Sequence, residues 1–295
     1  MDYRDTVFLS VAENLSFSKA AEELFISQPA VTKHIKELEN KYKISLFERK
    51  GNKILLTKAG KLAYSHLKVI KQQYRELEFD LGRLGDIFKG ELRIGASSTI
   101  SQYIIPHVMA DFHQRYPNIV LYLLNGNSFE MEQKLLENEI DMALVENSSS
   151  QANIRYSTFM NDEIVVVAGY NSVYSKRKAI SLSDFQEIPI VLREQGSGTL
   201  EVINKALVAS GLQYQDLNVA IHLGSTEAIK NFISKFDGIA LLSDKSVEKE
   251  IRYKELVRIN VKGLDINRCL RVANRQGHIS DASQLFSDHL AEYNY

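Results

Sequence analysis

Residues 17–40 read FSKAAEELFISQPAVTKHIKELEN, a pattern typical of two short helices separated by a tight break. Ser18 is the expected N-cap of the first helix, because a serine hydroxyl can accept from backbone N–H groups that the first turn leaves free. In the break, Ser27 can cap the second helix and Pro29 fits its first turn. We expect this second helix to run from Gln28 to Asn40. Apolar residues at helical spacing give each helix a buried face: Ala20, Ala21, Leu24 and Phe25 in the first, Val31, Ile35 and Leu38 in the second.

A further helix and a hairpin flank this pair. Val7, Phe8 and Val11 give the N-terminal segment an apolar helical face. Downstream, two short apolar segments, 46–47 and 54–56, enclose the basic run 49–53, which predicts a hairpin with a Gly-Asn turn. The arrangement predicts a winged helix-turn-helix domain over residues 1–58.

The exposed face of the second helix of the pair carries side chains suited to reading DNA. Amide, hydroxyl and lysine groups can bond to base edges in the major groove, and hairpin cations can contact the phosphate backbone. Residues 1–75 hold 14 Lys plus Arg against 8 Asp plus Glu, although the whole chain has a net charge of −1. A merely solvated amphipathic helix is the alternative, but the capped pair, the basic hairpin and the charge surplus together favour DNA binding. The predicted DNA-binding residues are Ser27, Gln28, Pro29, Thr32, Lys33, Lys36, Arg49, Lys50 and Lys53.

One long helix is predicted from Lys58 to about Phe88, with Thr57 as its N-cap. Its apolar residues alternate at intervals of three and four, the a/d seam of a coiled coil. A narrow stripe of this kind predicts pairing with a second copy of the chain, and docking on the chain's own body is the alternative. We therefore expect residues 59–89 to be a dimerisation linker. The seam consists of Ala63, Leu67, Ile70, Tyr74, Leu77, Leu81, Leu84 and Phe88.

After residue 90 the pattern changes to alternating strands and helices, which predicts an α/β fold with parallel strands in two lobes. A βαβαβ unit is expected over 91–146, with strands at 91–96, 119–124 and 140–146. A second set of strands follows, and the last strand and helix can return to the first sheet. We expect lobe I to hold residues 90–161 and 266–295, and lobe II residues 162–265. The later strands are expected at 163–168, 189–193, 219–223, 239–243, 256–261 and 269–274.

Composition narrows the class of protein. The 295 residues are 44% hydrophobic and 25% charged, typical of a folded globular chain of two or three domains. No apolar run approaches the roughly 18 residues of a membrane span, and residues 1–5 do not resemble a secretion signal, so we expect a cytoplasmic protein without a membrane partner. The single cysteine, Cys269, is expected to be a small core residue in a strand.

The sequence lacks three common enzyme motifs. The chain has no Gly-x-Ser-x-Gly, His-Glu-x-x-His or Gly-x-x-x-x-Gly-Lys-Ser/Thr sequence, and its seven histidines are scattered. We therefore predict no catalytic residue, no metal ligand and no cofactor. An α/β enzyme with a regulatory head and a free-standing solute-binding protein remain as alternatives, although neither explains the basic N-terminal region.

The N-terminal segments resemble the LysR-type transcriptional regulators. The resemblance implies a winged helix-turn-helix, a linker helix that pairs two subunits, and a two-lobed α/β effector domain like that of type 2 periplasmic binding proteins. It also implies a homodimer or homotetramer on an interrupted dyad in double-stranded DNA, and contact with RNA polymerase if the protein activates transcription. The matching segments are 17–24, 27–39, 46–49 and 56–60.

Hydroxyl-rich loops follow three predicted strands of the α/β body. Helix N-termini favour anions, and ligands of open α/β sheets gather at the carboxyl ends of strands, although each loop taken alone is more often a simple N-cap. The family resemblance implies a small effector between the lobes, which we expect to be anionic, and the segments around residues 95–100 and 193–199 resemble the subgroup that controls carbon fixation and sulfur assimilation. The predicted effector-binding residues are Ser97, Ser98, Thr99, Arg193, Ser197, Thr199 and Thr226.

Overall fold

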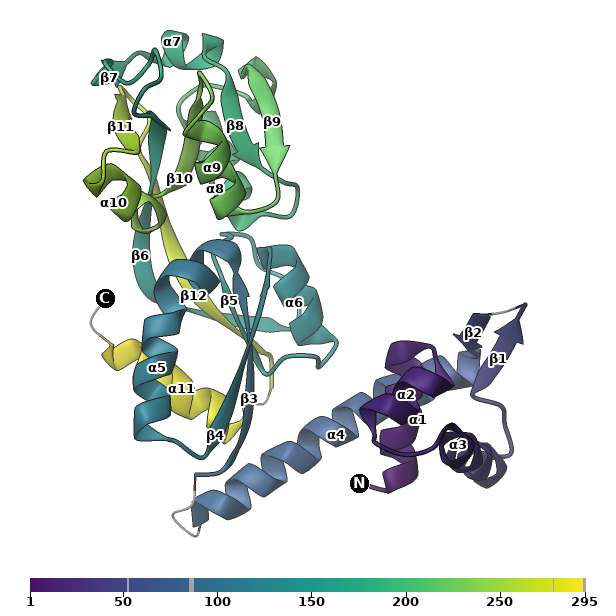
Figure 1. The fold of residues 1–295 in the computed structure, drawn as a ribbon. Coiled ribbons are helices and arrows are strands. Elements are labelled where there is room, and N and C mark those ends of the chain that lie inside the picture. Colours follow the sequence, from purple (N-terminus) through teal and green to yellow (C-terminus); the bar gives the residue numbers. More distant parts are fainter. Residues whose placement is uncertain (52, 85–87, 278, 294–295) are drawn as a thin grey trace. The chain divides into compact units, whose positions relative to one another are not determined.

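The computed structural model describes residues 1–51, 53–84, 88–277 and 279–293. The chain divides into two compact units, Met1–Ile87 and Phe88–Tyr295. Figure 1 shows a smaller helical unit with a hairpin, and a larger unit in which helices cover a mixed sheet.

The smaller unit contains the predicted three helices and wing. Its elements are α1 (Tyr3–Asn14), α2 (Phe17–Glu23), α3 (Gln28–Tyr42), β1 (Phe47–Lys50), β2 (Lys53–Leu56) and α4 (Lys58–Leu84). The predicted apolar faces meet in one core, in which Val7, Phe8, Val31 and Leu38 are fully buried. Ser27 caps α3 by accepting from the backbone N–H of Ala30, as predicted.

Two details of α2 differ from the prediction. Its N-cap is Ser16, whose hydroxyl accepts from the Lys19 N–H at 3.3 Å, because an N-cap must precede the helix and Ser18 already lies inside it. Phe25 was assigned to the buried face but is 95% exposed. Its φ of +54° ends the helix in a left-handed turn, which carries the side chain away from the face that Ala20 and Ala21 bury.

The seam of α4 has two parts. Ala63 and Leu67 pack on the helix-turn-helix core, so the first turns dock on the unit's own body. Further along, the described seam residues are exposed: Ile70, Tyr74, Leu77, Leu81 and Leu84, with 83% exposure at Leu84. Residues 85–87 lie outside the described residues and Phe88 is not helical, so the described helix ends before the predicted boundary.

The larger unit is built on one mixed sheet of two halves. Strands β3 (Gly90–Ser97), β4 (Ile119–Gly126) and β5 (Met142–Val145) pair in parallel, which confirms the βαβαβ prediction. The other half contains β8 (Ile190–Arg193) parallel to both β9 (Val219–Leu223) and β10 (Ile239–Ser243). The remaining strands are β6 (Ile154–Gly169), β7 (Ala179–Ile180), β11 (Leu256–Val261) and β12 (Ile266–Arg275).

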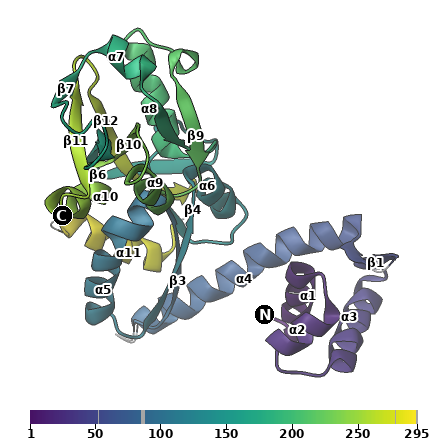
Figure 2. The ribbon, with the colours of Figure 1, turned by 45° about the horizontal axis from the view of Figure 1, so that its top comes forward.

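Two antiparallel strands join the halves. Strands β6 and β12 pair along most of their length and run through both halves (Figure 1, Figure 2). We name the half with β3, β4 and β5 lobe I, and the half with β8 to β11 lobe II. Lobe I carries α5 (Ile105–Arg115), α6 (Ser128–Leu136) and α11 (Asp281–Glu292); lobe II carries α7 (Leu182–Glu187), α8 (Gly198–Ala209), α9 (Thr226–Ile233) and α10 (Asp244–Arg252).

Some elements of this unit were missed. Strand β6 begins at Ile154 rather than at residue 163, because its first half is largely exposed and lacks an apolar run. Helix α10 was not predicted, since its sequence DKSVEKEIR has few apolar residues. Cys269 lies in a strand as predicted but is exposed, because its neighbours on β12 occupy the inward positions of the pleat. None of the helices in the described part of the chain is both long and apolar enough to cross a membrane.

Gly60 in the first turn of α4 allows the helix to approach the wing. A Cβ at this position would collide with the carbonyl oxygen of Leu46 and lie 2.9 Å from Leu56 Cδ2. We expect Gly60→Ala to lower the free energy of unfolding of the smaller unit by about 1–3 kcal/mol, the usual effect of overpacking, despite the better helix propensity of alanine.

Urea unfolding, with hydrogen exchange of peptides from the smaller unit, measures this loss. Gly224→Ala is the control, because this residue lies in the larger unit and a Cβ there meets nothing within 4 Å, so the smaller unit should stay as stable as in the wild type. Equal stability of the two variants would show that the helix and wing do not need this close approach.

Candidate functional site

The predicted DNA-reading residues lie on the surface of the smaller unit. Lys33 and Lys36 are exposed on α3, and Thr32 is half-buried. The Gln28 side chain donates to Thr32 Oγ1 at 2.8 Å, so these two groups form a pair on the helix surface. Among the described residues, the Lys33 ammonium has only a long ion pair to Glu37 at 4.0 Å, which leaves it available to other partners.

The cap and wing residues are also exposed. Ser27 and Pro29 lie at the start of α3, and Arg49, Lys50 and Lys53 lie on β1 and β2. Lys50 and Lys53 are paired across the hairpin. All nine predicted DNA-binding residues therefore belong to the helix-turn-helix unit, and eight of them are exposed.

Arg193 joins the two lobes. It ends β8, is 1% exposed, and makes hydrogen bonds to Ser98 Oγ of lobe I at 3.2 Å and to Thr226 Oγ1 of lobe II at 3.5 Å. Its guanidinium also holds both carboxylate oxygens of Glu194, at 2.8 and 3.0 Å. The structure thus brings three predicted effector residues together, but it gives the arginine an acidic partner within the chain.

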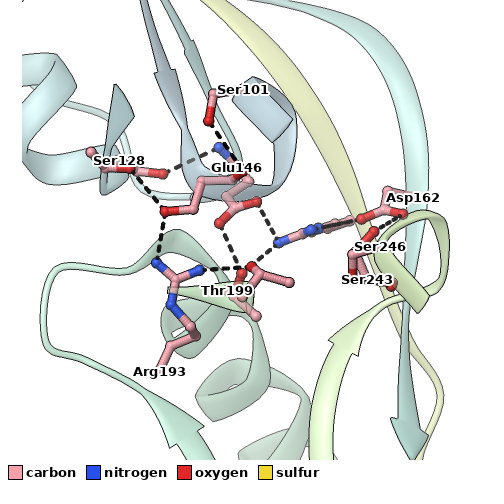
Figure 3. A network of polar contacts seen from close by, with 12 residues as sticks. Ser101, Ser128, Glu146, Asp162, Arg193, Thr199, Ser243 and Ser246 are labelled. Carbon is pink, nitrogen blue, oxygen red and sulfur yellow. Dashed lines mark hydrogen bonds and ion pairs between the residues drawn. The ribbon is translucent and has the colours of Figure 1, made fainter. Parts of the chain in front are cut away.

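Glu146 is the centre of a second group (Figure 3). This carboxylate of lobe I accepts from the Thr199 hydroxyl of lobe II at 2.8 Å and pairs with Arg268 at 3.0 Å. Complete burial raises the pKa of Glu146, but the charges of Arg268 and Arg193 and the hydroxyls of Thr199 and Thr99 outweigh it, so the pKa lies below its ordinary value. The carboxylate is therefore ionised inside the protein.

Arg268 extends this network to lobe II. It lies on β12 and holds Asp162 through Nε at 2.8 Å and Nη2 at 2.7 Å. Asp162 in turn accepts from the Ser243 hydroxyl at 2.8 Å. We call Ser98, Thr99, Glu146, Asp162, Arg193, Thr199, Thr226, Ser243 and Arg268 the inter-lobe cluster.

Sequence reasoning missed Glu146, Asp162 and Arg268. A signal was present at Arg268, because Ile266, Arg268 and Leu270 alternate on one face of β12 and their apolar members predict an inward position. A buried arginine needs carboxylate partners. The sequence does not indicate which acids these are, because both partners come from distant strands.

The hydroxyl loops could instead serve simply as helix N-caps. The loop before α9 does so through its side chain, and the loop before α8 does not. Ser225, beside Thr226, caps α9 by accepting from the Ala228 N–H at 3.1 Å. Ser197 occupies the N-cap position of α8 without a side-chain capping bond. Ser97 and Ser197 are both buried, and their hydroxyl oxygens have no hydrogen-bond partner among the described residues.

A pocket opens between α6 of lobe I and α8 of lobe II. Its volume is about 260 Å³, and its walls include Phe129, Glu132, Ser197, Leu200 and Glu201. Among the predicted effector residues, Ser197 contributes to this wall. We call this cavity the polar pocket.

One side of the polar pocket is a clasp between the lobes. Glu201 of α8 accepts from the backbone N–H groups of Ser148 and Ser149 at 3.1 and 2.7 Å, and from both of their hydroxyls. Burial alone would raise the pKa of Glu201, but hydrogen bonds from Lys205, Ser149 and Ser148 lower it by more than burial raises it. The resulting pKa is about 2. The clasp therefore depends on an ionised carboxylate.

On another side of the unit, Tyr103 makes a third link between the lobes. Its hydroxyl donates to Glu227 of α9, and the Lys230 ammonium lies 3.2 Å from that hydroxyl. Burial and the hydrogen bond to Glu227 raise the pKa of Tyr103 above its ordinary range. The tyrosine therefore stays protonated as the donor in this contact.

We expect Glu201→Gln to remove part of the acid sensitivity of the larger unit. A folded-state pKa of about 2 against the ordinary 4.5 means that this carboxylate stabilises the fold above about pH 4.5, and that the contribution is lost as the pH falls toward 2. The variant should be less stable at pH 7, and its melting temperature should fall less between pH 5 and pH 3.

Melting temperatures across this range, with the exposed Glu137→Gln variant as control, measure the difference. Parallel pH profiles for Glu201→Gln and the wild type would show that the clasp does not contribute to stability.

Comparisons with known proteins agree with this architecture. The model of the bacterial regulatory helix-turn-helix protein, lysR family, matches residues 6–61, and the LysR substrate binding domain matches residues 86–294. The RuBisCO operon transcriptional regulator of Allochromatium vinosum is 32% identical over 283 residues, covering 96% of this chain and 92% of that protein. The regulator CysL of Bacillus subtilis is 30% identical, covering 89% and 87%.

Solved structures give the same result. The CcmR regulatory domain of Synechocystis PCC6803, in complex with 2-PG, is 28% identical with a TM-score of 0.62 and covers 68% of this chain and 95% of its own. CbnR, complexed with its target DNA, is 17% identical with a TM-score of 0.71 and covers 98% and 99%, which shows the shared fold. On the two family models and the full-length relatives, this chain belongs to the LysR family of transcriptional regulators.

Proposed function

We propose that this regulator binds an interrupted dyad in double-stranded DNA as a homodimer or homotetramer, under the control of a small anionic effector held between its lobes. The observation that carries the DNA-binding part is the capped α3 beside a basic wing, with amide, hydroxyl and lysine side chains on its surface. A DNA-bound regulator acts in the cytoplasm, and it contacts RNA polymerase if it activates transcription.

We assign the DNA-binding domain to residues 1–58, the linker to 59–89 and the effector domain to 90–295. The strands that join the lobes support a division in which lobe II is residues 162–265, because β6 and β12 pass between the lobes near both ends of this range. The exposed seam of α4 supports pairing of subunits, since apolar residues in a long helix are normally buried against a partner.

Two features support an effector between the lobes. The polar pocket lies between α6 and α8, with the unpartnered Ser197 hydroxyl at the N-terminus of α8, where the helix dipole favours an anion. Three sets of contacts join the lobes: the inter-lobe cluster, the Glu201 clasp and the Tyr103 link. A ligand bound between the lobes can therefore favour one arrangement of the lobes over another. The names of two relatives, the RuBisCO operon regulator and CysL, support membership of the carbon fixation and sulfur assimilation subgroup.

We expect different residues of α3 to read the DNA bases and to contact the phosphate backbone. Gln28→Ala and Thr32→Val should change the preferred DNA sequence, because these groups can bond to base edges. Lys33→Ala and Lys36→Ala should weaken binding, and a lysine that contacts phosphate should reduce the salt slope of log affinity by about 1 when removed. Selection of sites from random DNA and titration at several salt concentrations measure these effects. An unchanged preferred site in both Gln28 and Thr32 variants would exclude α3 as the reading helix.

The exposed seam is expected to hold subunits together. Leu77→Lys with Leu81→Lys should convert the protein to a monomer at micromolar concentration, because each leucine loses about 1.5–3 kcal/mol of burial. Val69→Lys, an exposed apolar position of α4 away from the seam, should keep the wild-type assembly. Sedimentation velocity measures the oligomeric state, and an assembled double variant would contradict pairing through α4.

A further inference from the structure

The polar pocket has acidic walls. Among the described residues that line it are two carboxylates, Glu132 and Glu201, and no lysine or arginine. An effector that carried only negative charge would face both carboxylates without a cationic side chain on the pocket wall. The pocket therefore favours a ligand that has positive charge as well.

Glu132 is the group that can receive this charge. It is 1% exposed, and its hydrogen bonds from Asn147 at 2.9 Å and Tyr156 at 2.8 Å both end on Oε1. The other oxygen of this pocket residue is left for a donor in the cavity. Burial raises the pKa of Glu132 despite these hydrogen bonds and the nearby charge of Arg271, so an ammonium in the pocket would further stabilise the ionised carboxylate.

Helix α8 presents a complementary set of groups. Ser197, Glu201 and Asn204 line the pocket from positions i, i+4 and i+7, which share one face of a helix. The Ser197 hydroxyl is buried and has no partner, and it lies at the positive end of the helix dipole. The dipole of α8 therefore favours a negative group on the side of the pocket that α8 forms, whereas Glu132 lies on α6.

The Glu201 carboxylate is a weaker partner for the positive group of a ligand than Glu132 is. Its oxygens already accept from Ser148 and Ser149, and Lys205 pairs with it at 3.0 Å. Glu132 has no lysine or arginine within a described ion pair. The two ends of the pocket thus differ in charge preference.

We propose that the effector is a small zwitterion, bound in the polar pocket with its ammonium on Glu132 and its anionic group beside Ser197 at the N-terminus of α8. This rests on the proposed function, and it adds an ammonium to the anionic group of the effector at the same inter-lobe site. A volume of about 260 Å³, below the roughly 300–1,000 Å³ of drug-sized sites, suits a molecule the size of an amino acid.

Calorimetric titration of the full chain tests the proposal. The probes are the twenty common amino acids and β-alanine, each compared with its carboxylate analogue without nitrogen and with the matching hydroxy acid, and sulfate and phosphate as simple anions. We expect at least one amino acid to bind about tenfold or more tightly than both analogues, because a buried charge pair is lost without the ammonium.

The variants assign this preference to the pocket. Glu132→Gln keeps an acceptor for Asn147 and Tyr156, and it should remove the preference for the ammonium. Glu137→Gln, at the exposed C-cap of the same helix, should retain it. Ser197→Ala should weaken the amino acid and its analogues alike. Circular dichroism checks that each variant is folded.

Three results would overturn the zwitterion. They are equal binding of a hydroxy acid, an amino-acid preference that survives in Glu132→Gln, and no binding by any amino acid. If sulfate, phosphate or a simple carboxylate then bound and altered DNA binding, the regulator with an anionic effector would stand and the zwitterion alone would fail. If no probe bound while DNA binding persisted, the effector part of the proposed function would fail as well.

Discussion

The pairing of Arg268 with both Glu146 and Asp162 is the constraint on which the arrangement of the larger unit depends. All three side chains are 1% exposed, so each charge has lost its water and needs the others. Such a network adds little net stability compared with apolar packing, but removal of one partner leaves a buried charge and costs about 3–5 kcal/mol. Glu146 directly follows β5 of lobe I, and Asp162 lies where β6 passes toward lobe II. The pairing of both carboxylates with Arg268 therefore fixes where the lobes meet. The network therefore determines how the lobes are positioned more than it stabilises their association.

Other contacts act around this fixed centre. The Glu201 clasp and the Tyr103 link are more accessible than the Arg268 network, so they can break at lower cost when the lobes move. A ligand in the polar pocket touches α6 and α8 next to the clasp. It can change the relation of the lobes only by binding one arrangement more tightly than another. Contacts that differ between arrangements, such as those of Glu201, are the physical basis for that difference.

The cationic side chains of the two units serve different roles. The helix-turn-helix unit has cations that are exposed and weakly paired, which suits the phosphate backbone of DNA. The larger unit buries two arginines, Arg193 and Arg268, and matches both to carboxylates of the chain. Arg193 is already held by Glu194, so an anion that approached Arg193 would have to displace that carboxylate. The unpartnered hydroxyl of Ser197 offers a site that needs no such exchange.

The sequence alone determined the helix-turn-helix unit, because its signals are local: caps such as Ser27, apolar residues at helical spacing and a basic hairpin turn. It also determined the parallel βαβαβ segment and the family, since motif and periodicity lie within short stretches. The hydroxyl loops were predicted, but the sequence could not show that Thr199 bonds Glu146 or that Arg193 bonds Ser98. Those outcomes follow from strand crossings that join residues more than 50 positions apart. Only the tertiary structure decides them, because a buried charge is matched by whichever distant group the fold brings within reach.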